Sequence, residues 1–339
     1  MEWGTIPTIF AVAIPVFVLT MLIEWRMSRG HDHGHGYEAK DAAASVSMGI
    51  GFLLIQAPMK GVTVAGYAWL YQHRLFDLEV GVFTWLMLLL AEDLCYYWYH
   101  RLHHTVRILW ASHVNHHSSR FYNLSTALRQ AWTSPFTAPW FWMVLPLLGF
   151  PVELILIQQT VSLLYQYWIH TELIGSMGVF GSVFNSPSHH RVHHGSNLHY
   201  LDKNYGGIFI IWDRLFGTFQ AEDVAPVYGL TTNIESYNPV VIAFHEFAAA
   251  ARDVWQARSW RARVQFLIGP PGWREDGGGS VAQLQEAARR DARAGAASAA
   301  HQFVDDGGVG EGCQVPLGLI AGGDVGEKAP HDLARAGLR

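Results

Sequence analysis

Histidines gather in two stretches of the chain at a density that suits metal binding. Residues 100–117 read HRLHHTVRILWASHVNHH and contain six histidines, and residues 188–194 read SHHRVHH. Twelve of the 19 histidines fall between His100 and His199, so the clustering is not a matter of composition. Because histidine is the commonest metal ligand among side chains, the two stretches predict a shared metal centre.

The spacing of these histidines shows which of them can converge on a metal. On a helix, residues at i, i+3 and i+4 share one face, and the spacings here are H-x3-H, H-x2-HH and H-x2-HH. The eight candidate ligands are His100, His104, His113, His116, His117, His190, His193 and His194. Since one four-coordinate site needs four ligands, eight predict two metal ions. His170 and His189 are further candidates, whereas His103 points away from the face of His100.

The residues alone leave the identity of the metal open. An all-imidazole site suits zinc, iron, copper or nickel. The chain contains no H-E-x-x-H motif, which disfavours a zinc protease of that type.

Three polar residues precede the first histidines and could support them. Asp93 and Tyr97 share a helical face with His100 and His104, at offsets of 0, 4, 7 and 11. A carboxylate there could accept the second imidazole N–H and fix the tautomer of a ligand. Glu92 is a second candidate for this role. The alternative is that Glu92 and Asp93 lie in the lipid headgroup layer without a partner in the site.

Composition places the chain in a membrane. Charged residues make up 15% and hydrophobic residues 50% of the 339 residues, and the mean hydropathy is +0.12. The formal charge of −5 and the absence of a basic block argue against nucleic acid as a partner. We therefore expect an all-α polytopic membrane protein with four to five transmembrane helices and a cytoplasmic, histidine-rich, metal-binding helical cap.

Apolar segments give the expected helices. They lie at residues 6–23, 42–71, 80–104, 131–150 and 154–169. Residues 42–71 contain Pro58 and Lys60, so one kinked helix and a re-entrant pair both remain open. Residues 149–151 predict a turn between antiparallel helices. Residues 205–219 mix aromatic and charged side chains and are expected to be interfacial rather than spanning.

Basic residues at helix ends set the expected orientation and domain limits. Arg26 and Arg29 end the first apolar run, which by the positive-inside rule places that end, and both histidine stretches, in the cytoplasm. We expect a membrane-embedded domain over residues 1–271 with its histidine core at 85–219. Residues 272–339 are rich in Gly, Ala and Asp, which predicts a disordered tail.

Longer motifs around the histidines carry a family resemblance. EDLCYYWYHRLHH, HVNHHSSRFYNLSTALRQ and NSPSHHRVHHGSNLHYLDKNYGGIFIIWDRLFGTF are similar to the fatty acid hydroxylase and sterol desaturase superfamily, most of all to its alkylglycerol monooxygenase branch. The resemblance covers residues 85–219. It implies two iron ions held by the same eight histidines and hydroxylation of a lipid C–H bond with O2. For the named branch it also implies attack on the ether carbon of glyceryl ethers, with tetrahydrobiopterin as electron donor.

Two other functions remain open at this point. The first is desaturation or hydroxylation of a sterol or fatty acyl chain, which would take its electrons from a reductase partner. The second is a metal-binding membrane transporter. A transporter needs ionisable residues along a membrane path, whereas here they gather at one face, which favours a catalytic pocket.

Overall fold

The fold is all-helical in the part of the chain that the structure, a computed structural model, describes. This part comprises residues 5–29 and 36–291. Within it there is no β-strand, only two isolated bridges, Phe184 with Phe209 and Gly195 with Tyr228. The predicted all-α class is therefore confirmed for these residues. Of the tail predicted to be disordered, residues 272–339, the part beyond residue 291 lies outside the described residues.

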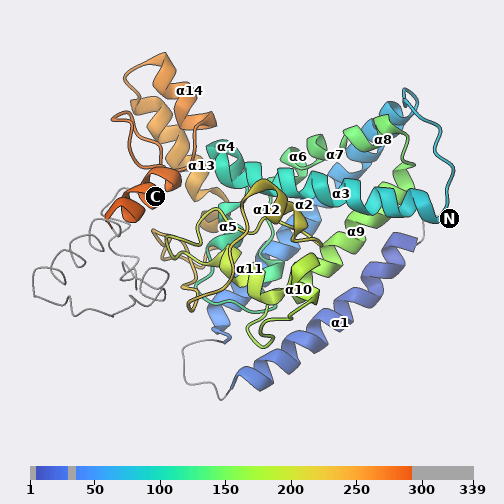
Figure 1. The fold of residues 1–339 in the computed structure, drawn as a ribbon, viewed down its shortest axis with the longest axis horizontal. Coiled ribbons are helices and arrows are strands. Elements are labelled where there is room, and N and C mark those ends of the chain that lie inside the picture. Colours follow the sequence, from blue (N-terminus) through green and yellow to red (C-terminus); the bar gives the residue numbers. More distant parts are fainter. Residues whose placement is uncertain (1–4, 30–35, 292–339) are drawn as a thin grey trace, which may run out of the picture.

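The helices along the chain differ widely in length. In order they are α1 (Thr5–Ser28), α2 (Ala39–Tyr71), α3 (Val82–Thr105), α4 (Arg107–Trp110), α5 (Val114–His117), a 3-10 helix η1 (Thr126–Leu128), α6 (Ser134–Thr137), α7 (Pro139–Trp142), α8 (Val144–Leu148), α9 (Val152–Trp168), α10 (Phe180–Val183), α11 (Pro187–His194), α12 (Ile211–Phe216), α13 (Pro239–Gln256) and α14 (Trp260–Ile268). Helices α1, α2, α3 and α9 form a bundle, and α4, α5, α11 and α12 gather beside it (Figure 1).

The bundle has an apolar core centred on α9. Leu88 of α3, Ile155 of α9 and Trp142 of α7 are buried together there. Tyr67 of α2 joins them and donates a hydrogen bond from its hydroxyl to the carbonyl of Pro139 at 2.8 Å. This contact also ties α2 to the start of α7.

The outer surface of the bundle is apolar as well. Leu54 of α2 is 72% exposed, and Val82 and Phe83 of α3 are 78% and 75% exposed. Among the described residues, α2 alone is long and apolar enough to cross a membrane. Contiguous apolar surface of this kind marks a site of contact with lipid or protein.

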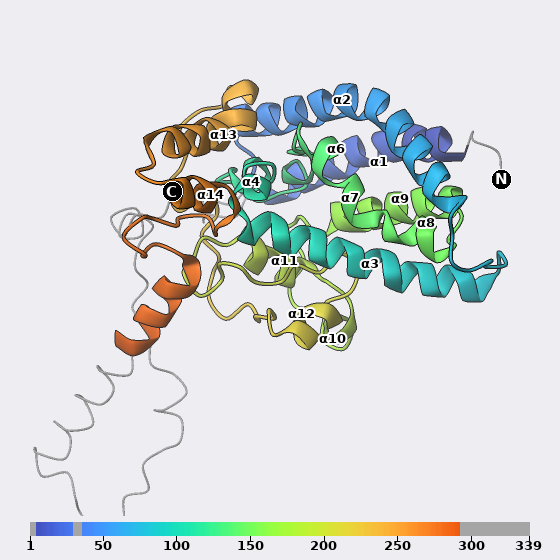
Figure 2. The ribbon, with the colours of Figure 1, turned by 90° about the horizontal axis from the view of Figure 1, so that it is seen from above.

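Helix α2 settles the choice that its sequence left open. It is one continuous helix of 33 residues with Pro58 inside it, so the re-entrant pair is excluded. Figure 2 shows that α2 bends part-way along its length. Proline removes a backbone donor and clashes with the preceding turn, which accounts for a bend without a break.

The run at residues 131–150 is not the single helix that its lack of charge suggested. Its three prolines, Pro135, Pro139 and Pro146, divide it into α6, α7 and α8. The turn expected at residues 149–151 is confirmed. Gly149 ends α8 with φ of 101°, a conformation that favours glycine.

Two C-terminal elements close the end of the fold beside the histidines. Helix α13 packs Ile242 and Ala243 against Ala44 and Met48 of α2. Residues 281–291 are helical, and Gln285 there donates to the carbonyls of Leu198 and Leu201 at 2.9 and 3.0 Å.

Candidate metal centre

The predicted ligands come together in two buried groups. The five-histidine group consists of His100, His104, His113, His117 and His193, and the four-histidine group consists of His116, His170, His190 and His194. Within each group the candidate ligand atoms all lie within 4.8 Å of one another. The structure thus brings together all eight histidines selected by spacing and adds His170. His103 and His189 lie outside both groups.

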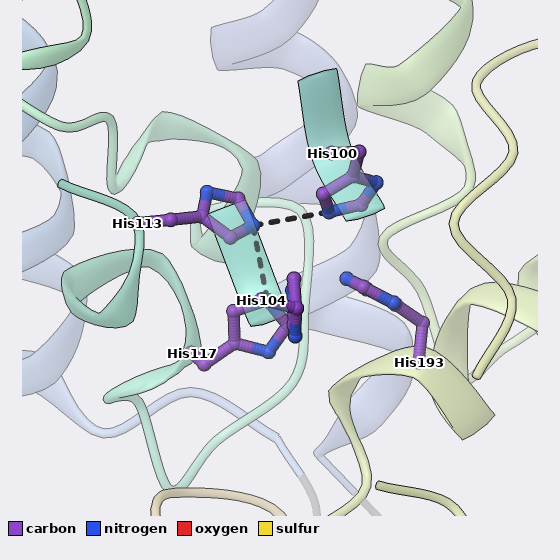
Figure 3. A group of neighbouring side chains, drawn as sticks. All are labelled: His100, His104, His113, His117 and His193. Carbon is purple, nitrogen blue, oxygen red and sulfur yellow. Dashed lines mark hydrogen bonds between the residues drawn. The ribbon is translucent and has the colours of Figure 1, made fainter. Parts of the chain in front are cut away.

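Four segments supply these side chains. Helix α3 provides His100 and His104 one turn apart, and α11 provides the histidines of residues 190–194. Helix α5 begins at Val114, so His113 directly precedes it. His170 follows the end of α9. Figure 3 shows the five-histidine group, with side chains from these separate segments turned toward a common centre.

Sequence neighbours serve different groups. His116 and His117 are adjacent on α5, and His193 and His194 are adjacent on α11, yet each pair is divided between the groups. Adjacent residues on a helix point about 100° apart, so each short helix faces two centres at once. The groups are therefore contiguous, and the rings of His117 and His194 stack with centroids 4.3 Å apart.

The Nδ1 atoms of three ligands are fixed by backbone carbonyls. His100 Nδ1 lies 2.8 Å from the carbonyl oxygen of Tyr205, and His193 Nδ1 lies 2.9 Å from that of Lys203. His170 Nδ1 lies 2.7 Å from the carbonyl oxygen of Gln166, one turn earlier. Because a carbonyl only accepts, each Nδ1 carries the proton and each Nε2 presents a lone pair.

The Nε2 atoms of each group converge on one another. In the five-histidine group, His113 Nε2 lies 3.0 Å from His100 Nε2 and 3.2 Å from His117 Nε2. In the four-histidine group, His190 Nε2 lies 3.0 Å from His170 Nε2 and 3.2 Å from His194 Nε2. Imidazole nitrogens gathered at this distance are positioned to share a cation.

Two further observations fit a metal ion in these positions. His104 Nε2 and His193 Nε2 are buried without a hydrogen-bond partner, which is costly unless something else binds them. Burial also lowers the pKa of His104 and His170 to about 4. Neutral imidazoles are the form that binds metal.

The expectation for Asp93 is wrong in its detail. Its carboxylate contacts no imidazole and instead accepts from the backbone N–H groups of Ile208 and Phe209 at 2.6 and 3.0 Å. The indole of Trp212 donates to it at 2.9 Å. The carbonyl of Tyr205 takes the imidazole N–H that Asp93 was expected to receive. Asp93 therefore supports His100 only indirectly, because it holds the loop that carries the Tyr205 carbonyl.

Glu92 and Tyr97 also have other partners than the histidines. Glu92 is buried in the bundle and accepts from the indole of Trp142 at 3.1 Å. The Tyr97 hydroxyl lies 2.9 Å from the hydroxyl of Thr218 and accepts from Arg101 at 3.0 Å. Both side chains pack α3 against its neighbours rather than orient a ligand.

A second carboxylate holds the same loop, and the spacing argument did not select it. Asp213 accepts from the backbone N–H groups of Tyr205 and Gly206 at 2.8 and 2.7 Å. A side chain at Gly207 would place its Cβ 2.7 Å from Asp93 Oδ1. The paired glycines at 206–207 were the sequence signal for this close approach.

Two more side chains border the imidazoles. Asp202 Oδ1 lies 3.7 Å from His104 Nδ1. The ring of Tyr122 lies 5.1 and 5.7 Å from those of His194 and His170, and its hydroxyl donates to the carbonyl of Ile169 at 3.0 Å. Arg129, seven residues after Tyr122, forms an ion pair with Asp41 of α2 and so connects α2 to the segment that carries Tyr122.

A cavity of about 290 Å³ reaches the five-histidine group. His104, His117 and His193 line it together with the indole of Trp110. Helix α13 and residues 229–234 form its other walls. A small molecule in this cavity would contact three histidines of the five-histidine group and His194 of the other group directly.

Comparisons with known proteins agree on the family. The fatty acid hydroxylase family matches residues 85–218. The human alkylglycerol monooxygenase is 38% identical over 273 residues, which is 79% of this chain and 60% of the relative. The alkylglycerol monooxygenase of Caenorhabditis elegans is 41% identical over 201 residues, or 56% of this chain and 40% of the relative. No solved structure matches the chain significantly.

A bacterial relative is named for a different lipid. The ornithine lipid hydroxylase OlsE of Rhizobium tropici is 30% identical over 164 residues, which is 48% of this chain and 50% of that protein. The chain spans about three fifths of the length of the vertebrate relatives it matches. All nine grouped histidines lie within the matched residues 85–218. The comparisons therefore show a fatty acid hydroxylase domain at residues 85–218 of the chain.

Proposed function

We propose that the chain is a membrane di-iron monooxygenase that hydroxylates a lipid C–H bond with O2. The observation that carries the proposal is the pair of contiguous imidazole groups whose Nε2 atoms converge. An unactivated C–H bond needs an oxidant that no amino-acid side chain supplies. Two iron ions, one held by each group, would supply this oxidising chemistry when bound.

The ligand assignment follows the two groups. The five-histidine group would hold one ion and the four-histidine group the other, with His170 as the ninth ligand and His189 outside. Imidazole-only ligation also suits zinc or copper. Iron is favoured because the relatives are named as monooxygenases and a hydroxylase.

The substrate is proposed to be a glyceryl ether lipid, attacked at the ether carbon. The alkylglycerol monooxygenases that match 76% to 79% of this chain support it. One oxygen atom of O2 enters the C–H bond and the other leaves as water, with two electrons and two protons from a donor. Tetrahydrobiopterin is the proposed donor, and the hemiacetal formed would collapse to a fatty aldehyde and a glycerol.

The protein's own residues would bind and orient in this reaction. The carbonyls of Lys203 and Tyr205 hold two imidazoles in one tautomer, and the clamped loop keeps those carbonyls in place. Trp110 and the apolar walls of the cavity would exclude bulk water from the five-histidine group.

The chain is proposed to cross the membrane several times, with both groups on the cytoplasmic side. Support comes from α2 and from the exposed apolar surface of α3. The positive-inside rule applied to Arg26 and Arg29 gives the orientation.

Product analysis tests the proposed reaction. Iron-loaded protein in lipid nanodiscs is supplied in turn with a glyceryl ether, a fatty acid and a sterol, each with and without tetrahydrobiopterin. Aldehyde release from the ether only with the pterin is expected, accompanied by substrate-dependent O2 uptake. Turnover of the acyl or sterol substrate only with an added reductase would replace this assignment by the desaturase or acyl hydroxylase function. Absence of O2 uptake with every substrate would contradict oxygenase function.

A further inference from the structure

Helix α13 buries its acidic side chains and exposes apolar ones. Its two acidic residues, Glu246 and Asp253, face inward and accept from the buried Arg107 at 2.9 and 2.7 Å. The outward face is apolar, with Phe244 42% and Trp255 86% exposed. A water-facing helix would show the opposite pattern.

Arginines border this apolar face. Arg252, Arg258, Arg261 and Arg263 follow one another along α13, its connection and α14. None of the four has an ion-pair partner among the residues that the structure describes. Trp260, at the start of α14, is 76% exposed. The outward surface of the two helices therefore combines exposed tryptophans with arginines that form no ion pair among the described residues.

The position of α13 next to α2 suggests what covers this surface. The inner face of α13 packs on Ala44 and Met48, in the first third of α2. The exposed apolar face of α2 begins directly beyond that contact, with Ile50 56% and Leu54 72% exposed. Figure 1 shows α13 and α14 projecting to one side of the bundle rather than continuing along it. The two apolar surfaces are thus neighbours.

We propose that α13 and α14 form a docking surface for the headgroup layer of an anionic lipid bilayer. Tryptophan is enriched at this depth because its ring is apolar and its N–H polar. Each arginine near an anionic surface is attracted to lipid phosphate. A helix with an apolar face and a basic border lies in the plane of the interface. A soluble acidic partner would account for the arginines but not for the exposed apolar face of α13 that includes Phe244.

This docking would position the cavity of the metal centre. His245, Ala249 and Arg252 of α13 line the cavity that reaches the five-histidine group. If the outer face of α13 rests on the bilayer, the cavity lies one helix diameter from the lipid headgroups. The inference concerns the membrane contact alone, so it can fail while the metal chemistry stands, and the reverse.

Spin labels on the full chain test the contact. Labels are placed by Phe244→Cys and Trp255→Cys on a Cys95→Ser, Cys313→Ser background, in nanodiscs of phosphatidylcholine and phosphatidylglycerol. Leu54→Cys on α2 serves as the lipid-exposed control, and Arg290→Cys, 75% exposed, as the aqueous control. Accessibility to O2, which enters the bilayer, is compared with accessibility to a nickel chelate, which stays in water.

The two helices should behave like the lipid control. The O2-to-nickel accessibility ratio at residues 244 and 255 is expected to exceed that at residue 290 and to approach that at residue 54. A ratio equal to that at residue 290 would overturn the proposal. Low accessibility to both reagents would also overturn it, because it indicates cover by the C-terminal tail or by a second copy of the chain.

Charge removal tests the lipid class. The triple variant Arg258→Gln, Arg261→Gln, Arg263→Gln should lower the ratio at residue 255 in the anionic nanodiscs to the value measured in pure phosphatidylcholine. Unchanged elution in size-exclusion chromatography checks that the variant is folded. An O2-to-nickel ratio at residue 255 that changes with neither the arginine substitutions nor the lipid charge would overturn the proposal that the lipids are anionic.

Discussion

The two histidine groups present the same ring nitrogen inward but are anchored by different parts of the chain. In the five-histidine group, His100 and His193 are fixed by carbonyls of the loop at residues 203–205. In the four-histidine group, His170 is fixed by a carbonyl of the preceding helix, α9. The first group therefore depends on a loop and its carboxylate clamps, whereas the second depends on the bundle.

The groups also differ in access. His104, His117 and His193 line the cavity, whereas the four-histidine group contributes only His194 to it. Tyr122 stands against His170 and His194 and closes that side. The five-histidine group is held by a loop and is accessible, whereas the four-histidine group is held by helices and is enclosed. This difference indicates that small molecules reach the five-histidine group and that the four-histidine group supports it.

The largest effect is expected from removing one ligand of each group. His193→Ala and His190→Ala change residues one turn apart on α11 but in different groups. Each substitution should release one iron per chain and lower turnover by more than about 100-fold. This loss is larger than the effect of removing a contact that only supports a ligand. Metal analysis and product assays check this. His189→Gln, on the same helix and outside both groups, should keep both irons; its loss of iron would contradict the grouping.

Cutting the loop clamp should separate the groups. Asp93→Asn replaces an acceptor of three hydrogen bonds and loosens the loop that carries the Tyr205 carbonyl. Iron affinity of the five-histidine group should fall about 10- to 100-fold, while the other group keeps its metal. Iron titration measures both. The matched control is Glu92→Gln, which does not touch the loop. Equal loss from both groups would show that anchoring is shared.

Crowding the clamp should give a smaller effect of the same kind. Gly207→Ala places a Cβ 2.7 Å from Asp93 Oδ1 and 2.8 Å from the ring of Tyr96. Overpacking of this size costs about 1 to 3 kcal/mol of folding free energy. Thermal unfolding in detergent should show the loss, with iron leaving the five-histidine group first. Gly66→Ala on α2, where no atom lies within 4 Å, is the control. Tolerance of Gly207→Ala would mean that the loop is not tightly held.

The smallest effect is expected on the enclosed side. Tyr122→Phe removes one hydrogen bond to the carbonyl of Ile169 but keeps the ring beside His170 and His194. Stability should fall by about 1 kcal/mol, and both irons should remain. Thermal unfolding and metal analysis check this. Loss of iron from the four-histidine group would assign the hydroxyl a role in holding its ligands.

Spacing predicted the grouped histidines well because most of them lie on helices. His190, His193 and His194 share α11, and His100 and His104 share α3, so periodicity placed them correctly relative to each other. What it could not predict was the division into groups. His116 and His117 are neighbours that serve different centres, and only the packing of four segments decides that.

The supporting contacts were less predictable than the ligands. The helical offset singled out Asp93 as the partner of an imidazole, but a backbone carbonyl, which every residue has, takes that place beside His100. Prolines at 135, 139 and 146 were visible in the sequence, yet the apolar run around them was read as one helix. Contacts between a side chain and the backbone of a loop, such as that of Asp213 with Tyr205, leave almost no sequence signal beyond nearby glycines.

The metal content of the purified full chain tests the central claim most directly. Elemental analysis, with X-ray absorption spectroscopy of the metal's ligand shell, gives both the number of ions and the atoms around them. Two groups of converging imidazoles predict two iron ions per chain with ligand shells dominated by histidine nitrogen. A single zinc ion per chain, or full turnover by metal-free protein, would contradict the account.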